Sequence, residues 1–596
     1  MEFIPANRPI ISRGVERIGL PTANEETRQK RTFIIAQIDG LSEAGFQRAL
    51  RARRFPFLSR MLRESKAVAG PWRAHVPTST SAFQAGLFYG IFNRIPGFFW
   101  FDRERQRRMR MNTSEDTSWV EEHLTEQVKP FTGLLTGGSS YSALFTGGAD
   151  NTFFTFSRLF SPRLNLSHRK GWIYLFLLSQ IFLVFRIAYY SAIEIVLSLV
   201  DVVRSAFRRY SPLAELKFLF PRIASVVVVR EIATLATILD IYRGVGPIYL
   251  NYFSYDEHAH YRGPNSTFAY WTLRGLDASI KRIYRATERA RRMGIRDYDL
   301  YVLSDHGQVR AYPFAELFEQ SPAIHFNQLF RALYGGSSNG SGIAGLTALR
   351  RRRMEKASTE LHESEVQRAE TIMAPIPGFR LLSKLFLRPP KRKLERQFGS
   401  PMPEALQFVS TGPVAHICIS NCKQPVTYEE MRECYPAFLD VLARHEGVGM
   451  ALCRTKSGGC KISCRGKWFD LGSEHELAQH APASAMEVLR RHQQELIRLA
   501  NLEWAGDLVL VGFGRADHRV ISYSLEHGSH SGISPEETTP FLLVPARCAR
   551  QWPELTSFDR INRIELRDLH ERLLGLYGHA AEQAISETGA AKILSD

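Results

Sequence analysis

Four side chains able to bind a metal or carry a proton crowd into YFSYDEHAHYRGP, residues 252–264. An apolar lead-in is followed by Asp256, Glu257, His258 and His260. Carboxylate and imidazole together are the donors that suit a divalent cation such as zinc. Glu257 and His258 need not bind the cation, since an exposed loop residue or an acceptor that orients an imidazole fits the same position. The remaining ligands must come from elsewhere in the chain.

Two more aspartates each end a predicted buried strand. Asp39 ends the strand in IIAQIDG, and Asp305 ends the one in YVLSDHG, where His306 follows directly. In an open α/β sheet, ligands gather beyond the carboxyl ends of the strands. Asp39, Asp256 and Asp305 at one such edge would repel one another unless cations lie between them. A single aspartate there is commonly a turn residue or a helix cap, but three of them favour a metal site.

Two further segments offer imidazoles and hydroxyls. EHGSHSG, residues 526–532, places His527 and His530 among small neighbours that permit close approach to a ligand. VPTSTSAFQAGLFYG, residues 76–90, carries several hydroxyls before a helical run, among them Thr80. A hydroxyl at a helix N-terminus lies in a positive field. Beside a metal, the pKa of this hydroxyl falls, so that it forms an alkoxide more readily. On its own, PTSTS also fits a helix cap.

The elements that must position these residues are short β-branched or aromatic runs separated by helical patterns. Residues 266–293, for instance, repeat apolar positions at intervals of three and four, which predicts a helix. Strands alternating with helices predict an α/β fold, here a three-layer α/β/α sandwich with a mostly parallel central sheet and an apolar helical insertion. The predicted strands are TFIIAQID (32–39), PIYLNYFS (247–254), YDLYVLS (298–304), HICIS (416–420), DLVLVGF (507–513) and PFLLVP (540–545).

With 596 residues, the chain is too long for one ordinary domain and long enough to bury a large core. We expect a catalytic α/β domain built from three parts of the chain, 31–150, 246–334 and 405–596, the last with C-terminal helices. The intervening and terminal segments are an N-terminal extension at 1–30, an apolar helical insertion at 151–245 and a basic, flexible insertion at 335–404.

The apolar segment 171–203 raises the question of membrane association. Its only charged side chains are Arg186, Glu194 and Asp201. On a helix with 3.6 residues per turn, Arg186 and Glu194 fall close to one face. A helix lying in the membrane interface, a membrane-spanning helix and a buried helix of a soluble insertion are the alternatives, and we favour the interfacial helix. A second apolar stretch, 223–242, contains three charged residues and is less suited to crossing.

The net charge limits the classes of partner that we expect, and the N-terminal sequence limits the expected location. The formal net charge is +17, with 77 Lys and Arg against 60 Asp and Glu, which suits an anionic partner such as a phosphate compound or an acidic lipid. Nucleic acid is not favoured, because aromatic residues do not alternate with the basic runs. The N-terminal MEFIPANRPIISRG lacks an apolar core, so we expect no cleavable secretory signal and a location on the cytoplasmic side in association with a membrane. The oligomeric state stays open.

Five motifs occur in the order IDG, PTST, D-x3-H followed by GP, SDHG and GSHSG. This series resembles the alkaline phosphatase superfamily, and most closely its nucleotide pyrophosphatase/phosphodiesterase branch. The resemblance covers roughly residues 31–105, 245–310 and 405–545.

The resemblance implies two divalent metal ions, most simply zinc, at the edge of a mixed α/β sheet. It implies that Thr80, the second threonine of PTST, is the nucleophile and forms a phosphothreonine intermediate. The two implied ligand groups are Asp39, Asp305 and His306 for one metal, and Asp256, His260 and His530 for the other.

The sequence departs from the pattern of this family in three places. SAFQ stands where F-P-N-H is common, PGFFWFDRE offers no clear equivalent of the asparagine that binds the phosphoryl oxygen, and GSHSG has serine where a glycine is usual. The expected function is a metal-dependent phosphodiesterase or nucleotide pyrophosphatase-like hydrolase of small phosphate esters. The alternatives are a phosphomonoesterase, a lipid headgroup phosphotransferase on the same fold, or a membrane-bound scaffold with a vestigial site.

Overall fold

A computed structural model describes residues 28–159, 181–207, 223–334, 405–555 and 564–577, except residues 421, 465 and 514–519. The proposed flexible insertion at 335–404 lies outside the described residues, as do nearly all of the N-terminal extension and the start of the apolar segment.

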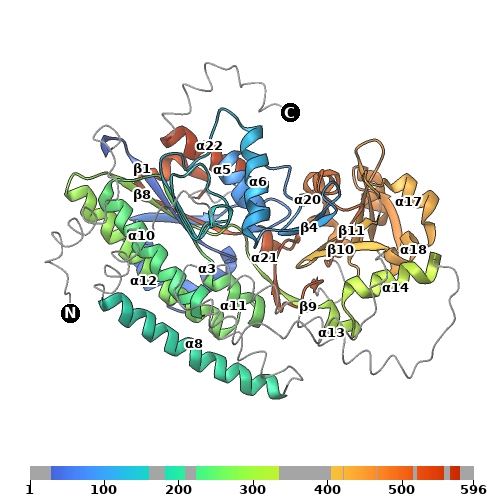
Figure 1. The fold of residues 1–596 in the computed structure, drawn as a ribbon, viewed down its shortest axis with the longest axis horizontal. Helices are drawn as coiled ribbons and strands as arrows, with labels where there is room; N and C mark the ends of the chain where they lie inside the picture. Colours follow the sequence, from blue (N-terminus) through green and yellow to red (C-terminus); the bar gives the residue numbers. More distant parts are fainter. Residues whose placement is uncertain are drawn as a thin grey trace.

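The centre of the molecule is a seven-stranded sheet in the order β2-β18-β8-β1-β7-β5-β6 (Figure 1). Strand β1 pairs in parallel with both β7 and β8, and β5 pairs in parallel with β6 and β7. Only β18 runs antiparallel to its neighbours, so the predicted mostly parallel sheet is confirmed. The strands are β1 (Thr32–Ile38), β2 (Ala67–Pro71), β5 (Ser139–Tyr141), β6 (Asn151–Phe153), β7 (Ile248–Tyr252), β8 (Tyr298–Leu303) and β18 (Phe541–Pro545).

Helices cover both faces of this sheet, which is why its central strands are apolar along their whole length. In β1, Ile34 and Ala36 pack on one side and Phe33 and Ile35 on the other, and all are buried. The first side carries α3 (Glu43–Arg51), α4 (Pro56–Arg63), α10 (Arg230–Arg243), α11 (Ser254–Arg262) and α12 (Thr267–Arg292). The second carries α5 (Thr80–Tyr89), α6 (Ser114–Gln127) and α22 (Leu566–Tyr577). The predicted three-layer sandwich is therefore present.

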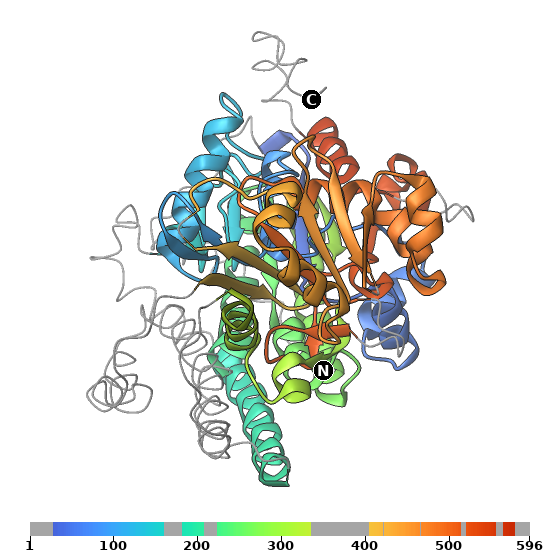
Figure 2. The same cartoon turned by 90° about the vertical axis from the view of Figure 1, so that its right-hand side faces the viewer.

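A second sheet of six strands, all antiparallel, is built from the later part of the chain (Figure 2). The predicted strands 416–420 and 507–513 belong to this sheet and not to the parallel one, which corrects the sequence-based expectation. In order, its strands are β10 (Leu406–Thr411), β11 (Val414–Ile419), β15 (Leu508–Val511), β12 (Met450–Arg454), β13 (Cys460–Cys464) and β14 (Lys467–Asp470). Helices α14 (Pro322–Tyr334), α17 (Tyr428–Cys434) and α18 (Pro436–Arg444) pack on one face, and α19 (Glu474–His480) and α20 (Ala483–Asn501) on the other.

Small elements join the two large sheets. Strand β9 (Val309–Pro313) leaves the parallel sheet after β8 and pairs with β16 (Val520–Ser522) and β17 (Gly528–Ser529). Because Ser529 pairs with Val309, the segment that carries His530 returns to the carboxyl end of β8. The remaining short elements are β3 (Phe99–Asp102), β4 (Arg107–Arg110), α13 (Phe314–Phe318), α21 (Pro535–Thr538), η1 (Phe156–Arg158), η3 (Ala546–Gln551) and η4 (Pro553–Leu555).

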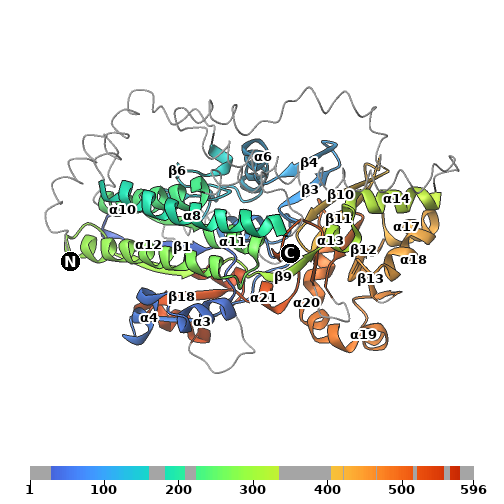
Figure 3. The same cartoon turned by 90° about the horizontal axis from the view of Figure 1, so that it is seen from below.

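The two apolar stretches take different positions. Residues 223–242 form η2 (Ile223–Val229) and most of α10, whose Arg230, Glu231 and Asp240 are all buried. Helix α8 (Ile181–Phe207) lies on the outer side of the layer that contains α10 and α12 (Figure 3). Within the described part of the chain, no helix combines the length and the apolar character that a membrane crossing requires.

Candidate active site

Three aspartates meet at one edge of the parallel sheet, as their positions after strands predict. Asp39 directly follows β1, Asp305 follows β8, and Asp256 lies in the first turn of α11, after β7. Since β7, β1 and β8 are parallel neighbours, their carboxyl ends meet at the same edge. The first turn of α5 brings Thr80 to the same place.

The first group of potential metal ligands is Asp39, Asp305 and His306, whose ligand atoms all lie within 4.8 Å of one another. His306 Nε2 is 3.2 Å from Asp305 Oδ2 and 3.6 Å from Asp39 Oδ1. The hydroxyl of Thr80 lies 3.4 Å from both Asp39 Oδ1 and His306 Nε2. All four side chains are buried, so this group forms a shielded acidic pocket around one hydroxyl.

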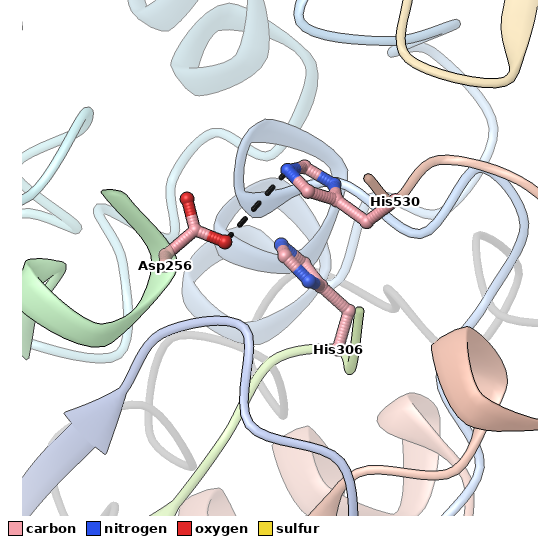
Figure 4. A group of neighbouring side chains, drawn as sticks. All are labelled: Asp256, His306 and His530. Carbon is pink, nitrogen blue, oxygen red and sulfur yellow. Dashed lines mark ion pairs between the residues drawn. The ribbon is translucent and has the colours of Figure 1, made fainter. Parts of the chain in front are cut away.

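The second group is Asp256, His306 and His530 (Figure 4), again with ligand atoms within 4.8 Å of one another. His530 Nε2 is 4.0 Å from Asp256 Oδ1, and the rings of His306 and His530 stack with centroids 3.8 Å apart. His260 contacts the same carboxylate, with Nε2 3.1 Å from Asp256 Oδ2. The six ligands expected from the sequence are therefore together, with His306 adjoining both groups.

Each of the three histidines has its Nδ1 at a backbone carbonyl oxygen. The distances are 2.9 Å from His260 to Gly528, 3.1 Å from His306 to Gly307, and 2.8 Å from His530 to Thr78. A carbonyl can only accept, so each Nδ1 carries the hydrogen, and in His306 and His530, whose pKa values are lowered by burial, Nε2 keeps a free lone pair. Burial opposes charge on His260 as well, but the carboxylates of Asp256 and Glu526 raise its pKa well above the usual value, so its Nε2 also carries a proton until a cation replaces it. This arrangement orients a histidine that binds a metal through Nε2, and all three Nε2 atoms face the carboxylates.

The electrostatics of the cluster also fit a cation. Burial and the negative charge of Asp256 raise the pKa of Asp305 to about 7. Its buried Oδ2 has no hydrogen-bond partner among the described residues. Burial, together with the positive charge of His530, holds the pKa of His306 well below its usual value, which keeps this imidazole neutral as a metal ligand must be. Crowded carboxylates and imidazoles are a donor set that suits zinc.

Two amides that the sequence reasoning missed hold the carboxylates in place. Asn251, near the end of β7, donates from Nδ2 to Asp39 Oδ2 at 2.6 Å. Gln308, two residues after His306, donates from Nε2 to Asp256 Oδ1. Both side chains are buried. The sequence shows that Gln308 follows the SDHG motif and that Asn251 lies near a strand end. It does not show in which direction these two side chains point.

Close backbone approach explains the glycine in two of the motifs. Gly40 of IDG has φ +74°, and a Cβ there would lie 2.4 Å from Asp256 Oδ1. Gly307 of SDHG is equally confined, because a Cβ would lie 2.0 Å from the carbonyl oxygen of Glu536. A larger residue at position 40 would displace Asp256, and one at position 307 would push the SDHG turn away from Ser42 and Glu536.

Thr80 is placed by the cap of its own helix. Ser79 is the N-cap residue of α5, and its hydroxyl accepts a hydrogen bond from the backbone N–H of Ala82 at 3.4 Å. Thr80 is therefore the first helical residue, where the helix dipole is positive. The PTSTS segment is therefore a helix cap that also brings the Thr80 hydroxyl to the carboxylate cluster.

A cavity of about 170 Å³ opens beside Thr80, between the parallel sheet and the loops of the second sheet. Part of its wall is polar, with Asp39, Asp256, Glu257 and Glu526. Another part is apolar and largely aromatic, with Phe98, Phe99, Leu144, Phe156 and Phe253. Thr411 and Gly412 show that the second sheet contributes to it. The shape of the cavity therefore fits a ligand with an anionic group beside Thr80 and a flat or apolar substituent against the aromatic wall.

Asn112 is a further polar residue of this cavity that sequence reasoning missed. Its side chain is 7% exposed, it lines the cavity with Thr80, and its Oδ1 has no hydrogen-bond partner among the described residues. A buried amide without a partner is costly, which marks Asn112 as a group available to a ligand. Lying 32 positions beyond Thr80 and after a basic run, it gave no recognisable motif.

The other histidines of the two motif segments lie outside the cluster. His258 Nε2 is 3.1 Å from Glu194 of α8, and Arg262 contacts its Nδ1. His527 is partly exposed and pairs with Glu316 at 3.6 Å. Of the four candidates in the 256–260 stretch, Asp256 and His260 therefore face the cluster and His258 does not.

An α/β/α sandwich with clustered carboxylates and imidazoles at the carboxyl edge of its sheet defines a class of metal-dependent hydrolases. The family model described as type I phosphodiesterase/nucleotide pyrophosphatase matches residues 33–378, which is more than half of the chain. The protein belongs to this family. It is an enzyme, a phosphoric ester hydrolase.

The solved structures to which this chain is similar include the following two. A murine ectonucleotide pyrophosphatase/phosphodiesterase 5, an inactive variant in complex with AMP, is 11% identical, with 92% of this chain and 95% of that chain covered and a TM-score of 0.38. Phosphonoacetate hydrolase from Sinorhizobium meliloti 1021, in complex with phosphonoformate, is 11% identical, with 92% and 96% covered and a TM-score of 0.41. No curated protein sequence matches significantly.

Proposed function

We propose that this enzyme hydrolyses small phosphodiesters or pyrophosphates through a covalent intermediate on Thr80. The observation that supports this most directly is the position of the Thr80 hydroxyl, 3.4 Å from both Asp39 Oδ1 and His306 Nε2 at the edge of the carboxylate cluster. A buried hydroxyl at the positive end of a helix and beside potential metal ligands is the arrangement that activates an alcohol as a nucleophile.

The cluster has enough donors for two divalent metal ions, and zinc fits the mixture of carboxylate and imidazole. In this proposal Asp39, Asp305 and His306 hold one ion, and Asp256, His260 and His530 hold the other, with His306 adjacent to both groups. When bound, the ions supply positive charge that stabilises the attacking and leaving oxygens of an in-line displacement. The metal identity and number belong to the proposal.

The chain's own residues account for the remaining chemistry. The Thr80 oxygen forms a bond to phosphorus while the bond from phosphorus to the leaving oxygen breaks, and Asp39 Oδ1 lies within reach of the hydroxyl proton. Water then attacks the phosphothreonine, the Thr80 oxygen leaves, and the hydroxyl is restored. In this proposal the Nδ2 group of Asn112, which lines the cavity, and the N–H groups at the N-terminus of α5 donate hydrogen bonds to the phosphoryl oxygens, where charge develops.

The cavity supports a diester with an apolar or aromatic substituent. The carboxylate side would receive the phosphoryl group, and the aromatic wall of Phe98, Phe99, Phe156 and Phe253 would pack against the rest of the substrate. Ring stacking of this kind favours flat substituents such as a nucleobase or a nitrophenyl group. A small-molecule phosphate ester is therefore the proposed substrate class.

The covalent step is tested by trapping it. The enzyme, supplied with zinc, is mixed with the p-nitrophenyl ester of a nucleoside 5′-monophosphate and denatured within one turnover, and the peptide that contains Thr80 is examined by mass spectrometry. We expect that peptide to carry the nucleotidyl mass, and the same peptide from Thr80→Val to lack it. A labelled residue elsewhere, or a Thr80→Val enzyme with the parent's turnover, would exclude this nucleophile.

A further inference from the structure

Helix α8 presents an apolar face to the outside of the molecule. Of the eleven large hydrophobic side chains that are exposed in the described residues, seven lie on this one helix. The exposed fractions reach 65% for Phe185 and 59% for Tyr189 and Val196. We call the following residues the outer face of α8: Val184, Phe185, Ala188, Tyr189, Ala192, Ile195, Val196, Leu199 and Val200.

Two charged side chains of α8, Glu194 and Arg186, point the other way, into the protein. Glu194 is buried and lies 3.1 Å from His258 of α11. Arg186 Nε lies 3.2 Å from Glu231 of α10. These contacts fix the rotation of α8 about its axis, because turning the outer face inward would break both of them. A surface helix normally exposes its polar side, and α8 does the opposite.

The outer face is continuous and long. Its members recur at intervals of three and four, so they form one stripe that spans about 24 Å between residues 184 and 200. Soluble proteins seldom expose a contiguous apolar patch of this kind unless it is an interaction site. We therefore expect another molecule or surface to cover this face.

The charges in the sequence around α8 select the occupant. Arg169 and Lys170 precede the helix, Arg204 lies in its last turn, and Arg208 and Arg209 follow it. Basic residues on both sides of this helix in the sequence, in a chain with a net charge of +17, favour a bilayer whose surface is anionic and whose interior is apolar. The inner face stays packed on α10 and α11, so lipid can reach only the outer face.

We propose that the outer face of α8 docks on an anionic lipid bilayer, with the helix axis along the membrane surface. Because α11 carries Asp256 and His260, and its His258 contacts Glu194, this docking would hold the catalytic cavity at a defined distance from the bilayer. The proposal does not depend on the substrate or on the nucleophile.

Flotation of the full-length protein with vesicles tests this. Vesicles of phosphatidylcholine alone are compared with vesicles that also contain phosphatidylserine. We expect the protein to float with the mixed vesicles, and less so at high salt or without the acidic lipid. A Phe185→Asp/Val196→Asp variant should lose binding by about tenfold or more. Its hydrolysis of a soluble diester should equal that of the parent.

The matched control is Leu317→Asp/Leu333→Asp, which changes two exposed apolar residues on α13 and α14 and should float as the parent does. The proposal is overturned if the parent does not float with either vesicle, or if the α8 variant floats like the parent. It is also overturned if light scattering shows a parent dimer that the α8 variant dissolves while vesicle binding is absent, since the face then belongs to a second copy.

A gentler variant covers the case in which the aspartate variant fails to fold. Phe185→Trp keeps the face apolar and adds a fluorophore. We expect brominated phosphatidylcholine/phosphatidylserine vesicles to quench the additional emission relative to the parent. Unquenched emission from the added tryptophan at saturating lipid would show that position 185 does not meet the bilayer, and the proposal would fail.

Discussion

At the scale of single residues, the hydroxyl of Thr80 is the most informative group to change. Thr80→Val keeps the shape of the side chain and removes only the hydroxyl, so turnover of a soluble diester should fall by roughly 10³-fold or more. Thr80→Ser keeps a hydroxyl and should retain a measurable part of the parent's kcat. Metal content, measured on the same samples, should be similar in all three proteins. A Thr80→Val enzyme with near-parent kcat would remove Thr80 from the chemistry.

Asn112 should contribute to the transition state more than to substrate binding. Its buried amide lines the cavity beside Thr80, and the donor to a phosphoryl oxygen would be its Nδ2 group. Removing one such charge-stabilising donor typically costs about 10²-fold in kcat. We expect Asn112→Ala to lower kcat by that order with a small change in KM. Asn112→Asp should be worse, because its negative charge repels the phosphoryl group. Equal losses in kcat from Asn112→Ala and from Ser142→Ala, another residue of this cavity, would indicate a general loss of packing instead.

The sequence alone placed the potential ligands well and their supporting residues poorly. Asp39, Asp305 and His306 could be predicted because aspartates at the ends of parallel strands must meet at one edge. Asn251 and Gln308 could not, since an amide in a strand or after a motif orients a carboxylate only if the chain geometry points it there. The same limit applies to Asn112, whose role depends on a cavity wall and not on a spacing.

At the scale of elements, one buried carboxylate ties two helices together. Asp277 of α12 accepts backbone hydrogen bonds from Phe57 at 2.8 Å and Leu58 at 3.0 Å, in the first turn of α4. Asp277→Ala would leave both N–H groups without this acceptor, which should lower the free energy of unfolding by about 1–3 kcal/mol. Urea unfolding at constant metal concentration measures this. The control on the same helix is Arg285→Ala, which changes an exposed side chain and should be close to neutral.

The same residue gives a pH-dependent prediction. Burial raises the pKa of Asp277 to about 6 in the folded protein, above the ordinary value of an aspartate. A raised pKa means that the folded state holds the proton more tightly, so the contribution of Asp277 to stability falls as the pH rises from about 4 to above 6. Asp277→Asn cannot titrate and should remove this part of the slope. Parallel stability–pH curves for parent and Asp277→Asn would show that the pKa is not raised.

The elements that the sequence could not assign correctly were those of the second sheet. HICIS at 416–420 and DLVLVGF at 507–513 are short buried runs, and such runs look the same in parallel and antiparallel sheets. The difference lies in their pairing with each other, Val414 with Val511 for example, across about a hundred residues of chain. Only the three-dimensional register reveals that pairing. The central strands alternate with helices in the sequence, and this local pattern is enough to predict that they are parallel.

At the scale of the whole molecule, the cavity depends on how the two sheets meet. Strand β9 continues from β8 and pairs with β16 and β17, so the imidazole of His530 reaches a cluster whose other members come from the parallel sheet. The buried ion pair of Arg103 with Asp507, 2.6 Å apart, joins the β3–β4 segment to the second sheet. The residues that line the cavity therefore come from widely separated parts of the chain, and the site exists only in the assembled fold.

Metal removal should affect this whole assembly, not activity alone. Without a cation, Asp39, Asp256 and Asp305 bring carboxylates to one buried edge, and burial together with the negative charge of Asp256 raises the pKa of Asp305. Dialysis against a chelator should abolish diester hydrolysis and lower the Tm, and zinc should restore both. A ligand at a hundredfold excess over its Kd adds about 2.7 kcal/mol of stability.

The direction in which Asp305→Asn changes the Tm distinguishes electrostatic repulsion within the cluster from a general loss of structure. Asp305→Asn removes a carboxylate from the cluster, so in the metal-free protein it should raise the Tm above that of the metal-free parent, because less negative charge is buried there. In zinc, the same variant should bind less metal and be less stable than the parent. His527→Ala, whose parent side chain is partly exposed and paired with Glu316 outside the cluster, should change neither value. If Asp305→Asn lowers the Tm equally with and without zinc, the carboxylate cluster is a structural network of the fold and does not hold a cation.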